Sequence, residues 1–204
     1  MRRTTFTQAA LAAAVATAAL AIPPAVAQDA PVAGPAKAQQ ATATDRLARG
    51  RYLVTVAGCN DCHTPWHQGP NGPEPDMSRM LSGHPEDAEL SPPPRPAGPW
   101  IVAAMATNTA WSGPWGVSFT ANLTPDPETG LGRWTQRNFT ETIRTGRHLG
   151  RGRPVLPPMP IPMYKHFTDE DLEAIFTYLQ SIPPVRNRVP EPLPPATAVA
   201  DATP

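Results

Sequence analysis

The pentapeptide Cys59-Asn60-Asp61-Cys62-His63 is the stretch of this chain with the most specific chemical spacing. Cys-x-x-Cys-His is the spacing of a c-type haem attachment site, in which each thiol adds to one vinyl group of the porphyrin. The neutral imidazole that follows can then bind the iron as its proximal ligand. We therefore predict covalent haem attachment through Cys59 and Cys62, with His63 as an axial ligand.

Two other interpretations of the pentapeptide are a redox Cys-x-x-Cys pair and half of a metal site. The chain holds only these two cysteines, which excludes a four-cysteine zinc ribbon and a multi-bridge disulfide framework. A redox pair normally occurs beside a βαβ pattern, and none flanks these residues. Haem attachment is the interpretation that the sequence favours.

A second axial ligand is predicted at Met159, in the run Pro157-Pro158-Met159-Pro160. The prolines hold this methionine in an extended loop, and its thioether is a soft donor that suits iron. A His/Met pair raises the reduction potential relative to two imidazoles. The alternative is a methionine that fills a gap in the core, and Met163 in the same loop is the nearest rival ligand. Weaker candidates are Met77, Met80 and Met105; His67, His84, His148 and His166 are expected to be surface or loop residues, with His67 left unassigned.

The N-terminus has the pattern of a cleaved export signal over residues 1–27. Arg2 and Arg3 form a positive region, an apolar run follows from Leu11 to Ile22, and the small residues before position 28 fit a cleavage site. The run is short for a membrane span. Export to the periplasm agrees with haem attachment, which is completed outside the bacterial inner membrane. The formal net charge of zero gives no indication of nucleic-acid binding.

The remaining pattern predicts one domain, at residues 44–189, between a flexible leader (28–43) and a disordered Pro-rich tail (190–204). The first helix is expected to start at Thr44 and to end at Gly58. Gly50 in that helix has two interpretations of equal weight, a close-packing point for a second helix and a plain helix-weakening residue.

Two more helices are predicted in the second half of the chain. One runs from Thr135 to Thr145, and the other follows the N-cap Thr168 with an apolar stripe and ends at Pro183-Pro184. We expect the apolar faces of the three helices to share a haem as their partner. The insert over residues 64–133 is expected to be mostly irregular, with a strand or hairpin at 111–119, and to cover one side of the haem or to offer a docking surface.

The order of these elements resembles that of class I periplasmic cytochromes c. More narrowly, the phrases Ala121-Asn122-Leu123-Thr124-Pro125-Asp126 and Pro158-Met159-Pro160 are similar to those of the cytochrome modules associated with bacterial alcohol and aldehyde dehydrogenases. The resemblance covers residues 44–189 and implies a mainly α, cytochrome c-like helical domain around one covalently bound haem. It also implies that Cys59 and Cys62 carry the thioethers and that His63 and Met159 are axial. The alcohol dehydrogenase cytochrome subunits carry three such modules, whereas this chain has one.

The expected function is that of a periplasmic one-electron carrier, not an enzyme in its own right. It would accept electrons from a dehydrogenase and pass them to a cytochrome or a terminal oxidase, with no nucleic-acid partner. Membrane association would be only peripheral or through a partner protein. The alternatives are a haem protein with an open coordination position, such as a peroxidase or gas sensor, and a fixed cytochrome subunit of a membrane dehydrogenase complex.

Overall fold

The structure is a computed structural model, and it describes residues 42–90 and 99–195. The predicted signal peptide (1–27), the predicted leader up to residue 41, and the tail beyond residue 195 lie outside the described residues. Among the helices that are described, none has the length and apolar character needed to cross a bilayer.

Helices α1 (Ala43–Val56) and α5 (Asp169–Leu179) pack directly against each other. The N-cap of α1 is Thr42, two residues before the predicted N-cap Thr44, because Thr42 forms a capping box with Asp45. α5 begins after Thr168, as predicted. A Cβ atom built on Gly50 would lie 1.9 Å from the carbonyl oxygen of Ala174 in α5. Gly50 is therefore a close-packing point between two helices, which decides between its two interpretations.

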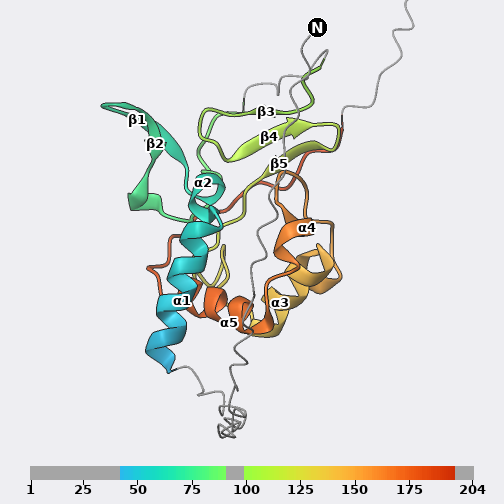
Figure 1. Cartoon of the computed structure of the whole chain (residues 1–204). Coiled ribbons are helices and arrows are strands. Elements are labelled where there is room, and N and C mark those ends of the chain that lie inside the picture. The colour runs from blue at the N-terminus through green and yellow to red at the C-terminus, as the bar shows by residue number, and fades with distance from the viewer. Residues whose placement is uncertain (1–41, 91–98, 196–204) are drawn as a thin grey trace, which may run out of the picture. The chain divides into compact units, whose positions relative to one another are not determined.

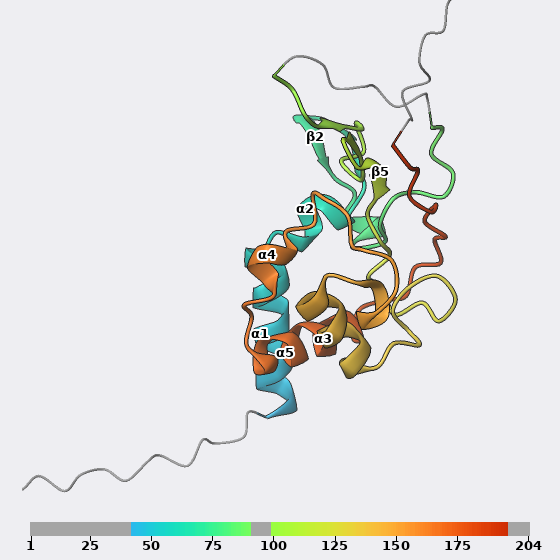
Figure 2. The same ribbon diagram turned by 90° about the vertical axis from the view of Figure 1, so that its right-hand side faces the viewer.

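Helix α3 (Gln136–Thr145) begins after the N-cap Thr135 and ends at Gly146, as the sequence predicted. Gly146 has φ 65°, the left-handed conformation that commonly ends a helix. The buried Phe139 of α3 packs on Phe176 of α5, with 5.4 Å between ring centroids. Figures 1 and 2 show α5 between α1 and α3. The haem-motif residues themselves form a short helix, α2 (Cys59–His63), and α4 (Ile161–Tyr164) follows the methionine loop.

The described part of the insert contains two small antiparallel sheets. Strands β1 (Trp66–Gly69) and β2 (Gly72–Pro75) form one hairpin. Strands β3 (Ala103–Ala104), β4 (Ala110–Gly113) and β5 (Gly116–Phe119) form the other sheet, in which β4 pairs with β5. The hairpin predicted at 111–119 is confirmed, while the β1–β2 hairpin was not predicted. Short 3₁₀ turns occur at η1 (Met77–Arg79) and η2 (His148–Gly150).

The expectation of a mainly α fold is wrong. The five α-helices are short, and helical residues make up 34% of the chain that the structure describes, against 14% in strands and bridges, so about half of it is neither. The physical reason lies in the insert, where proline and glycine break helical runs and leave extended segments that pair locally.

Ordered structure also extends past the predicted domain boundary at residue 189. Leu193 exchanges two backbone hydrogen bonds with Val117 of β5, each 2.9 Å long. The described part of the segment predicted to be a disordered tail therefore adds to the edge of the second sheet.

Candidate haem site

A cavity of about 500 Å³ lies between α2, the segment after β5, α3, the methionine loop and α5. This volume is typical of cofactor sites, which measure about 300–1,000 Å³. Its walls include the apolar faces of α3 and α5, with Ile143 and Leu172 among them, but none of its described lining residues comes from α1. Of the three helices expected to share a haem as partner, α3 and α5 line this cavity. α1 instead packs on α5, because Gly50 lets their backbones approach closely.

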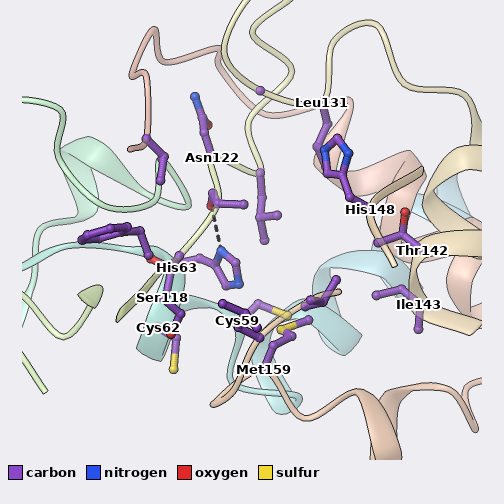
Figure 3. Close-up of a pocket in the computed structure, with 18 of the residues that line it drawn as sticks. Cys59, Cys62, His63, Ser118, Asn122, Leu131, Thr142, Ile143, His148 and Met159 are labelled. Atoms are coloured by element: carbon purple, nitrogen blue, oxygen red, sulfur yellow. Dashed lines mark hydrogen bonds between the residues drawn. The ribbon is translucent and has the colours of Figure 1, made fainter. Parts of the chain in front are cut away.

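Cys59 and Cys62 lie one turn apart on α2, and both line the cavity. Gly58, with φ 69°, separates α1 from α2 and so sets the direction of the short helix. The two thiols form no disulfide with each other. Burial raises the pKa of Cys59 to about 12 and raises the pKa of Cys62 as well. Figure 3 shows Cys59 near Met159 beneath the His63 ring, whereas the Cys62 side chain is directed away from them.

His63 is buried in the cavity wall, and its Nδ1 atom lies 2.8 Å from the carbonyl oxygen of Ala121. A carbonyl oxygen only accepts hydrogen bonds, so Nδ1 carries the proton and Nε2 keeps its lone pair. Burial lowers the pKa of His63, which favours this neutral form. A neutral histidine whose other nitrogen donates to a carbonyl is the usual arrangement of a metal-binding imidazole. The residues present therefore fit a haem iron at Nε2.

The Ala121 carbonyl is held in place by a backbone ladder between the segments 81–84 and 120–123. His84 N donates to Thr120 O and Leu123 N donates to Leu81 O, both at 2.9 Å. Gly83, between them, donates from its N to His63 O at 2.8 Å. Gly83 has φ 79°, and a Cβ atom there would lie 2.5 Å from Thr120 O. Only glycine fits this position without displacing the ladder.

Two buried asparagines, Asn187 and Asn122, make hydrogen bonds that hold the segments of this ladder in place. Asn187 donates from Nδ2 to the carbonyls of Ser82 and His84, at 2.7 and 2.9 Å, and accepts from Glu86 N. Asn122 donates from Nδ2 to Val185 O at 2.8 Å. In the sequence, Asn122 stands out only as part of the Ala121–Asp126 stretch that resembles the cytochrome modules. Neither Asn187 nor Gly83 belongs to a recognisable motif. A glycine in a loop and an asparagine beyond the last helix carry no local signal that distinguishes them.

Met159 lines the cavity, and no other methionine of the described residues does. The side chain of Met163, its nearest rival in the sequence, is exposed, at 71% of its full accessible surface. The loop is fixed on both sides, since Ile161 N donates to Met159 O at 2.9 Å and the Ser118 hydroxyl donates to Pro157 O. The structure thus brings Cys59, Cys62, His63 and Met159 to one cavity.

The remaining histidines fall into different environments. His84, expected to be a surface or loop residue, lies in a loop but is fully buried, and its Nδ1 lies 2.9 Å from Thr109 Oγ1. His148 lines the cavity and lies edge-on to Trp134, with 5.1 Å between ring centroids. His67 and His166 are exposed. Within the described residues, no group of three or more His, Cys, Asp or Glu side chains converges as a metal site.

Curated relatives of the chain are components of bacterial oxidoreductases. It is 34% identical over 145 residues to the gluconate 2-dehydrogenase cytochrome c subunit of Pantoea cypripedii, which is 70% of this chain and 25% of that protein. It is 31% identical over 145 residues to a nicotinate dehydrogenase subunit of Pseudomonas putida, 71% of this chain and 9% of the relative. It is 27% identical over 148 residues to the cytochrome c subunit of the quinone alcohol dehydrogenase of Gluconobacter oxydans, 71% of this chain and 24% of the relative. No family model matches the chain.

These similarities confirm the resemblance predicted from the sequence. The homologues are cytochrome c subunits of bacterial dehydrogenases, together with a diheme cytochrome c, at 24–34% identity over about 70% of the chain. The chain spans a quarter or less of the length of the gluconate, nicotinate and alcohol dehydrogenase relatives.

Proposed function

We propose that this protein is a periplasmic one-electron carrier that holds a single haem c. Cys59 and Cys62 form the thioether bonds, and His63 and Met159 are the axial ligands. The observation that carries this proposal is that all four residues line one cavity, where Nδ1 of His63 donates a hydrogen bond to Ala121 O. When bound, a haem c supplies reversible one-electron chemistry at its iron.

The protein's own residues fix the conditions for that chemistry. Ala121 O orients the His63 ring and raises the basicity of Nε2. The apolar faces of α3 and α5 exclude water from the cavity. If His63 and the thioether of Met159 both bound a haem iron, no coordination position would be left for a substrate. The residues therefore support electron transfer instead of catalysis at the iron.

The donor in this proposal is a dehydrogenase and the acceptor is a cytochrome or terminal oxidase of the respiratory chain. Its support is the set of relatives whose names describe cytochrome subunits of alcohol, fructose and gluconate dehydrogenases. The same names favour a second candidate, a fixed cytochrome subunit of such a complex. Purification from the native membrane, with and without mild salt, distinguishes the two candidates. A fixed subunit would co-purify with a dehydrogenase chain, and a free carrier would not.

Haem attachment is tested by replacing both thiols. In Cys59→Ser with Cys62→Ser, the exported protein is expected to hold no haem after acid-acetone extraction, whereas the wild type keeps it. The domain should also lose stability, because a haem that fills the cavity contributes its binding energy to folding. Covalent haem in the double variant would overturn the proposal. The iron content per chain of the wild type tests whether one haem is bound.

A further inference from the structure

An arginine-rich segment, residues 133–153, covers α3 and the turn that follows it. It contains six arginines and one carboxylate, Glu141, although the whole chain has a formal net charge of zero. Three of the arginines form ion pairs: Arg137 with Glu141, Arg144 with Asp169 and Arg153 with Glu191. The other three, Arg133, Arg147 and Arg151, are exposed and pair with no carboxylate of the described residues. We call the exposed face of this segment the arginine face.

The backbone holds this face in a defined shape. Residues 146–155 form a closed loop, in which Gly152 N donates to His148 O and Val155 N donates to Gly146 O, both at 2.8 Å. The backbones of Arg147 and Pro154 form an isolated antiparallel β-bridge. The Arg147 guanidinium also donates a hydrogen bond to Gly152 O at 2.9 Å. Arginines on a preorganised backbone lose less conformational entropy on binding than arginines on a mobile segment. Their planar guanidinium groups suit paired hydrogen bonds to carboxylates.

The arginine face adjoins the cavity. His148 and Arg153 line the cavity, and the Trp134 ring that packs on His148 lines it too. A molecule bound on this face would therefore lie next to the proposed haem, and electron transfer requires such proximity. Positive charge beside a redox centre attracts anionic partners and raises their rate of association.

We infer that the arginine face is the docking surface for a redox partner protein that presents a cluster of Asp and Glu residues. The inference rests on the proposed electron-transfer function. A membrane surface is the less suitable occupant, because surface-bound segments combine basic residues with inserted apolar ones. The exposed large hydrophobic residues of the described chain all lie outside 133–153.

The test uses the small anion hexacyanoferrate(III) as oxidant of the reduced, haem-loaded full chain. One electron leaves the ferrous iron and reduces hexacyanoferrate(III) to hexacyanoferrate(II). At about 0.01 M ionic strength, where charges act over roughly 30 Å, Arg151→Glu is expected to lower the second-order rate about three- to tenfold. The difference should shrink at high salt. With the cation tris(phenanthroline)cobalt(III) as oxidant, the same variant should react faster than wild type.

Arg51→Glu is the matched control. Arg51 is also exposed and has no ion-pair partner among the described residues, but it lies on α1, on the other side of α5 from α3 (Figure 1). Its rates should stay close to those of wild type. Equal effects of both variants would show a net-charge effect only and would overturn the inference.

The class of partner is tested with two further probes. Poly-L-glutamate should slow oxidation of the wild type by hexacyanoferrate(III) at low salt, and Arg151→Glu should be much less sensitive. If phosphatidylglycerol-containing vesicles bind the protein through Arg151 while poly-L-glutamate has no effect, the face is a membrane site and the inference is wrong. If the purified chain held no haem, the proposed function itself would be wrong. If Arg151→Glu kept an intact haem spectrum and the oxidation rates of the wild type, only the proposed docking surface would be wrong.

Discussion

The Nδ1 atom of His63 lies 2.8 Å from the carbonyl oxygen of Ala121, which is 58 residues further along the chain. This hydrogen bond joins the haem motif to the insert, and it determines which ring nitrogen is available to a metal. The orientation of the His63 ring, in a motif of five consecutive residues, thus depends on a distant segment. The contacts that hold this segment in place can be tested by substitution.

Gly83→Ala should disturb the His63–Ala121 hydrogen bond. The new Cβ atom would lie 2.5 Å from Thr120 O, on a residue whose φ of 79° already disfavours alanine. A longer bond makes the imidazole a weaker donor to iron, which favours the ferrous state. The reduction potential of the haem-loaded variant, measured by redox titration, should rise by roughly tens of mV. A variant with unchanged potential would show that this contact does not tune the iron. Gly72→Ala is a control for the φ effect, because a Cβ there meets no atom within 4 Å.

Asn187→Ala should destabilise the folded protein by about 2–4 kcal/mol, because it leaves the buried carbonyls of Ser82 and His84 and the Glu86 N–H without their partner. The urea denaturation midpoint measures this. Arg188→Ala, at the exposed next position, should change the midpoint little. Similar midpoints for the two variants would contradict a supporting role for Asn187.

Met159→Ala should leave the thioethers intact and open one face of the iron. The oxidised protein should lose its weak far-red sulfur-to-iron band and gain the ability to bind imidazole, and its potential should fall. A fall on the order of 100 mV corresponds to roughly 2.3 kcal/mol for one electron. Met163→Ala, whose side chain is exposed, should keep both the band and the potential. The reverse result would assign the ligand to Met163, and no change in either variant would point to a residue of the insert.

Acid should destabilise the fold through His84. Burial lowers the pKa of His84 below the usual 6.5, so the unfolded chain binds a proton more readily than the folded one. The stabilisation from neutral His84 is therefore fully present above about pH 6.5 and is lost as the pH falls toward the folded-state pKa. The free energy of unfolding, measured by urea at several pH values, should fall less steeply on acidification in His84→Gln. An identical slope in wild type and variant would exclude His84 as the group responsible.

Much of the candidate site was predictable from local sequence. Cys59, Cys62 and His63 lie within the five residues of α2, and their spacing alone predicts haem attachment. The caps at Thr135 and Thr168 are likewise local, because a hydroxyl satisfies the N–H groups of the next turn whatever the tertiary context. The fold class was mispredicted, because the strands of the insert are stabilised by pairing partners that short, Pro-rich segments do not reveal.

The sequence by itself determined the haem motif, the helix starts at Thr135 and Thr168, and the proline-bounded position of Met159. Tertiary structure decided the function of Gly50, which lies against Ala174, and the support of Ala121 by Asn187. The physical reason is the range of the interactions involved. Capping and motif spacing act within one turn of helix, whereas close packing and buried hydrogen bonds join residues whose sequence separation carries no periodic signal.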